Sequence, residues 1–218
     1  MKKIMFSDRY GLTEAVLSGR KTMTRRIVKG PRRFKGCEDT CLEFHKRPNS
    51  DIWYDCVVCD ADGHELGQLL LPFKVGDVVA VAQSYKDIPM DFLLSYLDDP
   101  RKRYFEQQFI RQSAGWQNKL FTLPEKMPHR IRITDLWFER LQDISDGDAM
   151  REGIRQSVVE YGDKKIVQWT YFGEKTTTWF DSPRAAFAAL IDRISGRGTW
   201  KSNPWVVAYE FELIKKEG

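Results

Sequence analysis

The sequence predicts a fold of the α+β class, and three observations lead to this prediction. Short strand-sized apolar segments alternate with isolated helical segments, without the regular rhythm of a βαβ protein. The chain has 218 residues, 42% of them hydrophobic and 30% charged, which is typical of a globular protein with one main core. No apolar run approaches the roughly 18 residues that a membrane helix requires. We therefore expect a single domain over residues 1–218 that has no membrane partner.

The N-terminal part combines a strand, a helix and an irregular insertion. Residues 3–6 form an apolar strand that is too short to serve as a signal peptide, which favours a cytoplasmic location. A helix over 13–17 is expected to end at Gly19, because glycine readily adopts the left-handed conformation that follows a helix. Residues 30–71 carry turn residues and little periodicity, so we expect an insertion with a hairpin around 53–58.

The middle of the chain contains a buried strand, a second insertion and the clearest strand of the sequence. Residues 78–82 are uniformly apolar, as in a strand that is covered on both faces. The second insertion spans about 87–126 and includes a helical segment over 91–112. The strand over 129–141 alternates in polarity, and one of its faces is expected to carry Ile131, Ile133, Asp135 and Trp137.

The last third predicts two capped helices, a hairpin and a closing strand. Ser145 is a favourable N-cap for a short helix, because its hydroxyl can accept a hydrogen bond from a free backbone N–H. Ser182, followed by Pro183 at the first helical position, starts a second helix. The Thr and aromatic content of 166–179 is typical of a hairpin, and 205–214 reads as the last strand.

Basic residues are concentrated in one segment of a chain whose formal net charge is only +4. No Asp or Glu occurs between Ala15 and Cys37, where the positive residues are Arg20, Lys21, Arg25, Arg26, Lys29, Arg32, Arg33 and Lys35. A localised positive surface suits an anionic partner such as nucleic acid. A solvated loop rich in lysine and arginine is the alternative.

The four cysteines lie in one stretch and are arranged as two close pairs, Cys37 with Cys41 and Cys56 with Cys59. Such pairs can supply the thiolates of a structural zinc site, although the first pair is one residue wider than the usual spacing. Unligated thiols are the favoured alternative, and disulfides are not expected in the cytoplasm.

Several motifs of enzymes and cofactor-binding proteins are missing from the chain. It contains no GxGxxG, GxxxxGK[ST], HExxH or GxSxG motif. Nothing therefore indicates a nucleotide cofactor, a zinc protease or a hydrolase nucleophile elbow. We expect that no cofactor is required, with structural zinc as the one exception under consideration.

Four blocks of the chain, in this order, resemble the ASCH domain family, a branch of the PUA-like β-barrels. The resemblance is carried by Gly19-Arg20-Lys21-Thr22-Met23-Thr24-Arg25-Arg26, by Lys74-Val75-Gly76-Asp77-Val78, by the segment 129–153, and by Asn203-Pro204-Trp205. The chain looks most like the longer, phage-associated type, in which insertions separate the blocks. The resemblance implies a partly open β-barrel with flanking helices, whose cleft binds RNA or a modified nucleoside.

Some proteins of this family are amidohydrolases that remove the acetyl group of N4-acetylcytidine, and others are ribonucleases or RNA-binding modules. Their catalytic lysine and threonine correspond in motif position to Lys21 and Thr24. Their glutamate, from the helix that follows the long strand, corresponds to Glu152. The resemblance therefore implies a Lys/Thr/Glu site in this chain.

The chemistry of such a trio can be stated independently of the family. A threonine hydroxyl attacks an amide only if a neighbouring base takes its proton, and a lysine is such a base only when it is neutral. Burial and nearby positive charges would lower the pKa of Lys21. One geometric difficulty arises if residues 21–28 form a regular strand, because Lys21 and Thr24 would then point to opposite faces. A bulge or twist would be needed to bring them together.

Further residues are predicted to bind the ligand or to support other functions. Trp200 and Asn203 lie at an expected cleft edge, where an aromatic ring can stack on a base. The arginines expected to contact phosphates are Arg20, Arg25, Arg26, Arg32 and Arg33. Four functions stay open at this point: an amidohydrolase, a non-catalytic RNA-binding module, a ribonuclease, and a phage-type accessory protein whose insertions contact a protein partner not identified by the sequence.

Overall fold

A computed structural model describes residues 1–161, 164–172 and 178–214. Its centre is a sheet with the strand order β1-β8-β9-β12-β2, in which β1 and β8 are parallel and the other neighbours antiparallel. The bounds are Lys3–Ile4 for β1, Val78–Val81 for β8, Arg130–Arg140 for β9, Trp205–Ile214 for β12 and Met23–Ile27 for β2. The α+β class is confirmed. Within the described part of the chain the sheet is open and does not close into a barrel.

A bulge divides the long strand β9 into two halves. Asp135 pairs with Glu210 and Ile133 with Phe211, so Thr134 has no partner in β12. Because an extra residue shifts the alternation by one, Ile131 and Ile133 are buried as predicted, whereas Phe138 is buried further along the strand. The prediction that Asp135 and Trp137 lie on the same face as Ile131 and Ile133 is therefore wrong.

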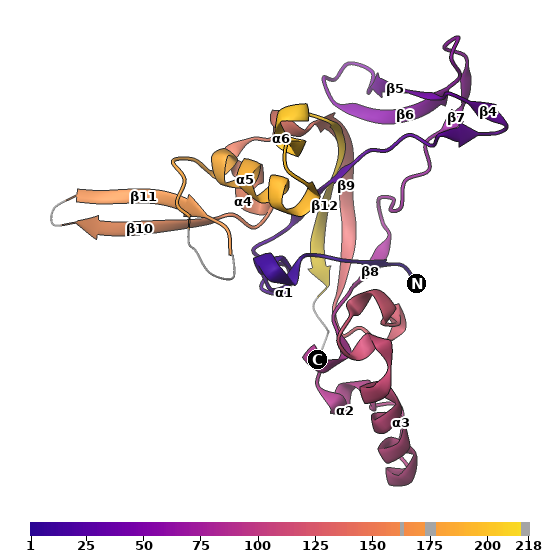
Figure 1. Cartoon of the computed structure of the whole chain (residues 1–218), viewed down its shortest axis with the longest axis vertical. Coiled ribbons are helices and arrows are strands. Elements are labelled where there is room, and N and C mark those ends of the chain that lie inside the picture. Colours follow the sequence, from indigo (N-terminus) through magenta and orange to yellow (C-terminus); the bar gives the residue numbers. More distant parts are fainter. Residues whose placement is uncertain (162–163, 173–177, 215–218) are drawn as a thin grey trace.

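Four helices accompany the central sheet (Figure 1). Their bounds are Leu12–Leu17 for α1, Asp146–Arg151 for α4, Pro183–Ser195 for α5 and Thr199–Ser202 for α6. Both predicted N-caps are confirmed, since the hydroxyls of Ser145 and Ser182 accept hydrogen bonds from backbone N–H groups three residues later. The α5 helix buries Phe187, Leu190 and Ile191 in the main core.

The first insertion contributes three strands that are joined to the central sheet and a separate two-stranded sheet. Its strands are β3 (Arg33–Phe34), β4 (Cys37–Glu38), β5 (Cys41–Lys46), β6 (Trp53–Cys59) and β7 (Glu65–Gln68). The β6 strand pairs with β5 and β7, and one pair, Trp53 with Phe138, joins it to β9. A hairpin around 53–58 is thus incorrect. That segment is a single strand, and the turns lie on either side of it, at Asn49 and Gly63, both with positive φ.

The second insertion is helical and has a separate small core. It contains α2 (Met90–Leu93) and α3 (Pro100–Gln112), and its core includes Ile88, Leu93 and Ile110. The predicted continuous helix over 91–112 is interrupted. Asp99 caps α3 by accepting a hydrogen bond from Arg101 N, and the proline that follows it cannot continue a preceding helix.

A third projection is the hairpin of β10 (Arg155–Tyr161) and β11 (Lys164–Thr170). The hairpin predicted over 166–179 begins earlier in the chain than expected. Residues 164–170 are its second strand, and they pair with residues 155–161. Residues 173–177 of that prediction lie outside the described residues. Figure 1 shows the two insertions and this hairpin pointing away from the central sheet in three directions. Among the described helices, none combines the length and apolar character needed to cross a membrane.

Candidate functional site

One hollow of about 360 Å³ lies where β2, the residue after α4, the α5 helix and the segment 5–7 meet. This volume is within the range of about 300–1,000 Å³ that is usual for small-molecule sites. Its polar lining includes Lys21, Thr24, Arg25, Arg26, Lys29 and Glu152. The apolar side is supplied mainly by Phe6, Phe187, Leu190, Ile191 and Ile194. Sequence reasoning missed this apolar wall, because the α5 residues read as an ordinary core-facing stripe.

Lys21 reaches the floor of the hollow because the chain turns back after α1. Gly19 has a φ of +75°, and Lys21 N donates a hydrogen bond to Ala15 O at 2.8 Å. The Lys21 ammonium nitrogen lies 2.5 Å from Glu152 Oε2 and 2.8 Å from the Glu152 carbonyl oxygen. The lysine side chain is only 2% exposed. Lys21 and Glu152 therefore form a buried pair that solvent barely reaches.

The difficulty of opposite strand faces does not arise. The β2 strand begins at Met23, so Lys21 precedes it and does not follow its alternation. Thr22 lies between Lys21 and the first residue of β2. Its N–H donates a hydrogen bond to Arg151 O, and its carbonyl oxygen accepts one from Phe211 N. Lys21 and Thr24 thus share the hollow without a bulge in β2.

Glu152 is placed by the end of α4 and by the glycine that follows. It is the C-cap of that helix and is 4% exposed. Gly153 has a φ of +107°, and a Cβ atom there would lie 3.2 Å from Leu12 Cδ2 and 3.7 Å from Lys21 Cδ. Only glycine accommodates both this conformation and this close approach, so Gly153 lets α4 end against the Lys21 side chain.

Arg25 forms ion pairs with three carboxylates, one of which is that of Glu152. Its Nε lies 2.5 Å from Glu139, its Nη2 3.1 Å from Asp148, and its Nη1 3.3 Å from Glu152. The side chain is 1% exposed. Arg25 was predicted to bind the ligand, but its guanidinium is occupied by these acids. It orients Glu152 instead.

The charges around Lys21 act on its pKa in opposite directions. Burial lowers the pKa of Lys21 from its ordinary value of 10.5, and the nearby charges of Arg26 and Arg25 lower it further. Glu152 raises it, although not enough to cancel the effect of burial. A buried lysine with a lowered pKa is a suitable general base, as the sequence analysis required.

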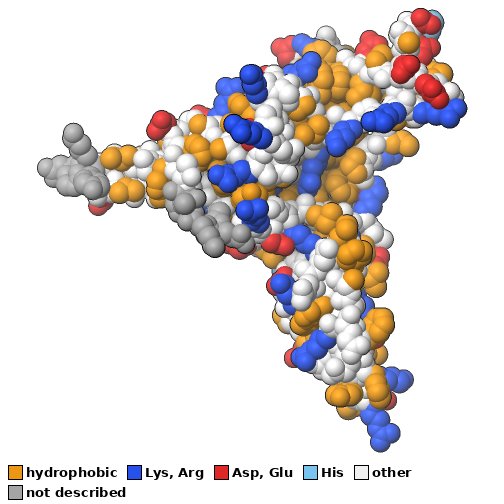
Figure 2. Space-filling view, in the orientation of Figure 1, with side chains coloured by type: hydrophobic (Ala, Val, Ile, Leu, Met, Phe, Trp, Pro, Cys, Tyr) orange, Lys and Arg blue, Asp and Glu red, His pale blue; other side chains and the backbone are white. Residues whose placement is uncertain are grey.

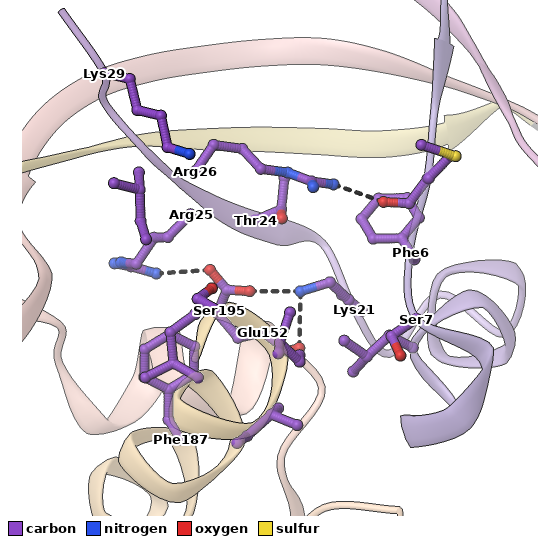
Figure 3. A pocket seen from close by; sticks show the side chains of 16 residues that line it. Phe6, Ser7, Lys21, Thr24, Arg25, Arg26, Lys29, Glu152, Phe187 and Ser195 are labelled. Carbon is purple, nitrogen blue, oxygen red and sulfur yellow. Dashed lines mark hydrogen bonds and ion pairs between the residues drawn. The ribbon is translucent and has the colours of Figure 1, made fainter. Parts of the chain in front are cut away.

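Thr24 faces the hollow from β2, opposite Tyr209 of β12 (Figure 3). Its side chain is buried. The three residues predicted to act together thus line one hollow, two of them in direct contact.

Arg26 and Lys29 form the outer polar edge of the hollow. The Arg26 Nη2 donates to Met5 O at 2.7 Å, and its guanidinium lies 5.7 Å from the centre of the Phe6 ring. The Arg26 Nε is buried and has no hydrogen-bond partner. Lys29 was not singled out from the sequence, although it belongs to the acid-free segment that could have identified it. Figure 2 shows Lys and Arg side chains near the chain that leaves β2 and over α5 and α6.

The other three predicted arginines lie outside this hollow. Arg20 pairs with Glu14 at 2.6 Å and borders a different surface depression, with Arg151. Arg32 and Arg33 belong to the first insertion, where they are exposed. Their prediction as ligands of the same site is therefore not supported by the placement of the insertion.

Trp200 and Asn203 have roles in packing and in a turn. Trp200 packs against Phe187 with ring centroids 6.3 Å apart, and its backbone N–H donates to Asp192. Asn203 adopts a φ of +45°, and its Oδ1 accepts from Gln142 N at 2.8 Å. Neither residue lines the hollow, so the structure does not bring them together with Lys21, Thr24 and Glu152.

The cysteines do not assemble as a zinc site in this structure. All four are free thiols, and Cys41 and Cys59 face each other across β5 and β6. Burial raises the pKa of Cys56 to about 12 and that of Cys59 to about 11, so both are protonated at neutral pH. Among the described residues, the one group of three or more ligand-type atoms close enough to share a metal ion is Asp60, Asp62 and His64, of which two are exposed.

Comparison with family models, with curated proteins and with solved structures finds no match for this chain. A proposal of function therefore rests on the chemistry of the hollow and on the resemblance of the sequence blocks.

Proposed function

We propose that the protein is an amidohydrolase of the ASCH type that removes the acetyl group from N4-acetylcytidine or a related acylated pyrimidine. The observation that carries the proposal is the meeting of Lys21, Thr24 and Glu152 in one small hollow. The family resemblance of the sequence blocks and the open, mainly antiparallel sheet are compatible with a PUA-like fold, which is part of the same proposal.

The first half of the reaction forms a covalent intermediate. Neutral Lys21 accepts the proton of the Thr24 hydroxyl while the hydroxyl oxygen bonds to the acetyl carbonyl carbon. The bond between this carbon and the exocyclic nitrogen then breaks, and the nitrogen takes a proton through Lys21 and Glu152. Cytidine leaves with a free amino group, and the acetyl group stays on Thr24 as an ester.

The second half regenerates the hydroxyl. A water molecule gives a proton to the same amine and attacks the ester carbon, which releases acetate and restores the proton to Thr24. The contact of 2.5 Å between Lys21 and Glu152 supports this proposal, because it provides a direct route for the proton in both halves. Arg25 keeps Glu152 in position throughout.

The shape of the hollow agrees with a planar acylated base as the substrate. One wall is apolar, from Phe6 and the α5 residues, and the opposite floor carries the polar groups. A flat ring can pack on the apolar side while its acetyl group reaches the floor. Phe6 is mostly buried, which favours it as a fixed part of this wall.

The test is incubation with N4-acetylcytidine and chromatographic measurement of cytidine and acetate. We expect turnover by the wild type and by Thr24→Ser, which keeps the hydroxyl, and a loss of at least about a hundredfold with Thr24→Val, which keeps the shape. Circular dichroism checks that each variant is folded. If the wild type leaves the substrate intact, or if Thr24→Val is as active as Thr24→Ser, the proposal is wrong.

A non-catalytic RNA-binding module is the second candidate, and the acid-free segment between Ala15 and Cys37 favours it. Contacts of several lysines and arginines with phosphates would make the affinity fall steeply as the salt concentration rises. A protein that binds RNA in this way but hydrolyses no acylated nucleoside would fit this candidate. RNA affinity that does not change with salt would contradict it.

A further inference from the structure

The positive charges at the hollow are not all balanced by acids. Lys21 and Arg25 are matched by Glu152, Glu139 and Asp148, with which they form direct ion pairs. Arg26 and Lys29 line the same hollow, but neither forms an ion pair with a carboxylate of the described residues. The cations of the floor are therefore engaged by acids in direct contact, whereas the two cations of the outer edge are not.

Arg26 is held in one orientation while part of its guanidinium stays unused. Its Nη2 is fixed on Met5 O at 2.7 Å and its plane lies near the Phe6 ring. Its Nε is buried without a partner. A buried N–H group is normally hydrogen-bonded, so an unpartnered one at a binding hollow indicates a missing acceptor. A guanidinium is suited to an anionic oxygen in that role.

Lys29 provides a second, more mobile cation on the same side. It follows the end of β2 and is exposed, so its ammonium can move toward a ligand. Figure 3 shows Lys29 and Arg26 on one side of the hollow and the pair of Lys21 and Glu152 on the other, with Thr24 between them. A ligand that spans the hollow would meet the acyl-transfer groups at one end and the two free cations at the other.

We propose that the substrate is a nucleotide rather than a free nucleoside: its acylated base lies against Thr24, and a phosphate on its ribose contacts Arg26 and Lys29. This inference rests on the proposed function for the base and adds the phosphate. A phosphate oxygen supplies the acceptor that the Arg26 Nε lacks, and its charge offsets the two free cations. The phosphate is supplied either by a mononucleotide or by a strand of RNA.

The experiment measures binding by calorimetry and does not depend on turnover. Thr24→Val is titrated with cytidine, with cytidine 5′-monophosphate and with a short single-stranded cytidine RNA at low salt. We expect the monophosphate to bind at least about tenfold more tightly than cytidine. Equal affinities for the two would overturn the proposal. RNA that binds more tightly than the mononucleotide identifies a strand as the source of the phosphate, and equal binding identifies the mononucleotide; both results support phosphate recognition.

Matched variants locate the phosphate. Lys29→Gln and Arg26→Gln are expected to remove most of the difference in affinity between the monophosphate and the nucleoside. Arg20→Gln removes the same charge from the same segment outside the hollow and is expected to keep the difference. If Arg20→Gln and Lys29→Gln have equal effects, the recognition is a general charge effect and the proposal fails.

Turnover separates this inference from the proposed function. If the wild type deacetylates N4-acetylcytidine and its 5′-monophosphate with equal kcat/KM, the amidohydrolase proposal stands and the phosphate inference falls. If it deacetylates neither, but the monophosphate binds more tightly through Arg26 and Lys29, the amidohydrolase proposal falls and phosphate recognition stands.

Discussion

At the scale of single residues, the central feature is a lysine that is buried against a glutamate. Burial lowers the pKa of Lys21 from 10.5, and Glu152 opposes this effect without cancelling it. The amine acts as a base only in its neutral form, which becomes more populated as the pH rises through the pKa. The rate of deacetylation should therefore rise with pH along a limb whose midpoint lies below 10.5.

The measurement is kcat/KM for N4-acetylcytidine from acidic to alkaline pH. Lys21→Arg serves as the control, because arginine stays protonated throughout and should be inactive at every pH. A profile without this limb, or substantial activity of Lys21→Arg, would show that Lys21 is not the base.

Arg25 allows a second prediction at the residue scale, on stability. Its removal leaves Glu139, Asp148 and Glu152 without their shared cation, two of them partly open to water. We expect Arg25→Ala to lower the free energy of unfolding, measured by urea titration, by roughly 3 kcal/mol. This value is at the lower end of the range for breaking a buried ion pair, because two of the acids are partly open to water. Arg20→Ala breaks a more exposed pair and should cost about 1 kcal/mol or less. Equal losses would mean that the buried network contributes little.

The same network marks the limit of what the sequence predicts for the site. Lys21 and Thr24 were paired through the resemblance of one short motif, although strand alternation spoke against their approach until the start of β2 at Met23 was known. The acids that occupy Arg25 are between 114 and 127 residues away from it in the chain. Nothing local distinguishes an arginine that binds such acids from one that binds a phosphate, so its role could not be predicted.

At the scale of elements, the sequence predicts features that depend on neighbouring residues, such as helix caps. It does not predict features that depend on pairing with a distant strand. The caps at Ser145 and Ser182 follow from hydrogen bonds within one helical turn and were correct. The bulge at Thr134 depends on pairing with β12, which no alternation within β9 reveals. A single unpaired residue there moved the buried face from Ile133 to Phe138.

The junction between α4 and Lys21 gives a prediction at this scale. Gly153→Ala adds a Cβ in contact with Leu12 and forces a φ of +107° on a residue with a side chain. Gly196 has a φ of +108° and open space around it, so Gly196→Ala carries the conformational cost alone. We expect about 1–2 kcal/mol for Gly196→Ala and at least about 1 kcal/mol more for Gly153→Ala.

Urea unfolding of the two variants gives this difference directly. Gly153→Ala should also slow deacetylation, because the shift needed to admit the Cβ moves Glu152 relative to Lys21, whereas Gly196→Ala should not. Equal losses in the free energy of unfolding of the two variants would show that the close approach at Gly153 does not contribute to the cost of adding a Cβ.

At the scale of the whole molecule, three projections leave one central sheet that carries the site (Figure 1). Two of the projections, with β3 to β7 and with α2 and α3, fall in segments that turn residues and loss of periodicity mark in the sequence. The sequence could not show how they attach. The first insertion is held at its base by the stacking of Phe44 on Trp205, with ring centroids 4.0 Å apart, and by one strand pair to β9. Such contacts join residues more than eighty positions apart in the chain.

The β10–β11 hairpin gives the last prediction, because its outer part pairs only with itself. Val158 and Val167 face each other there, and both are exposed, at 51% and 40%. The base of the hairpin is held by the pairing of Trp169 with Phe180.

The test replaces residues 158–167 with an Asn-Gly turn between the paired Ser157 and Gln168, which preserves this base. We expect the replacement to change the free energy of unfolding by less than about 1 kcal/mol. Deacetylation should also be unchanged, since none of the described residues of this outer part lines the hollow. A Trp169→Ala variant, which removes an indole packed at the base, should by contrast be clearly destabilised. If the shortened chain unfolds as readily as Trp169→Ala in urea, or loses deacetylation, the hairpin belongs to the same cooperative unit as the site and the division into a central sheet with independent projections is wrong.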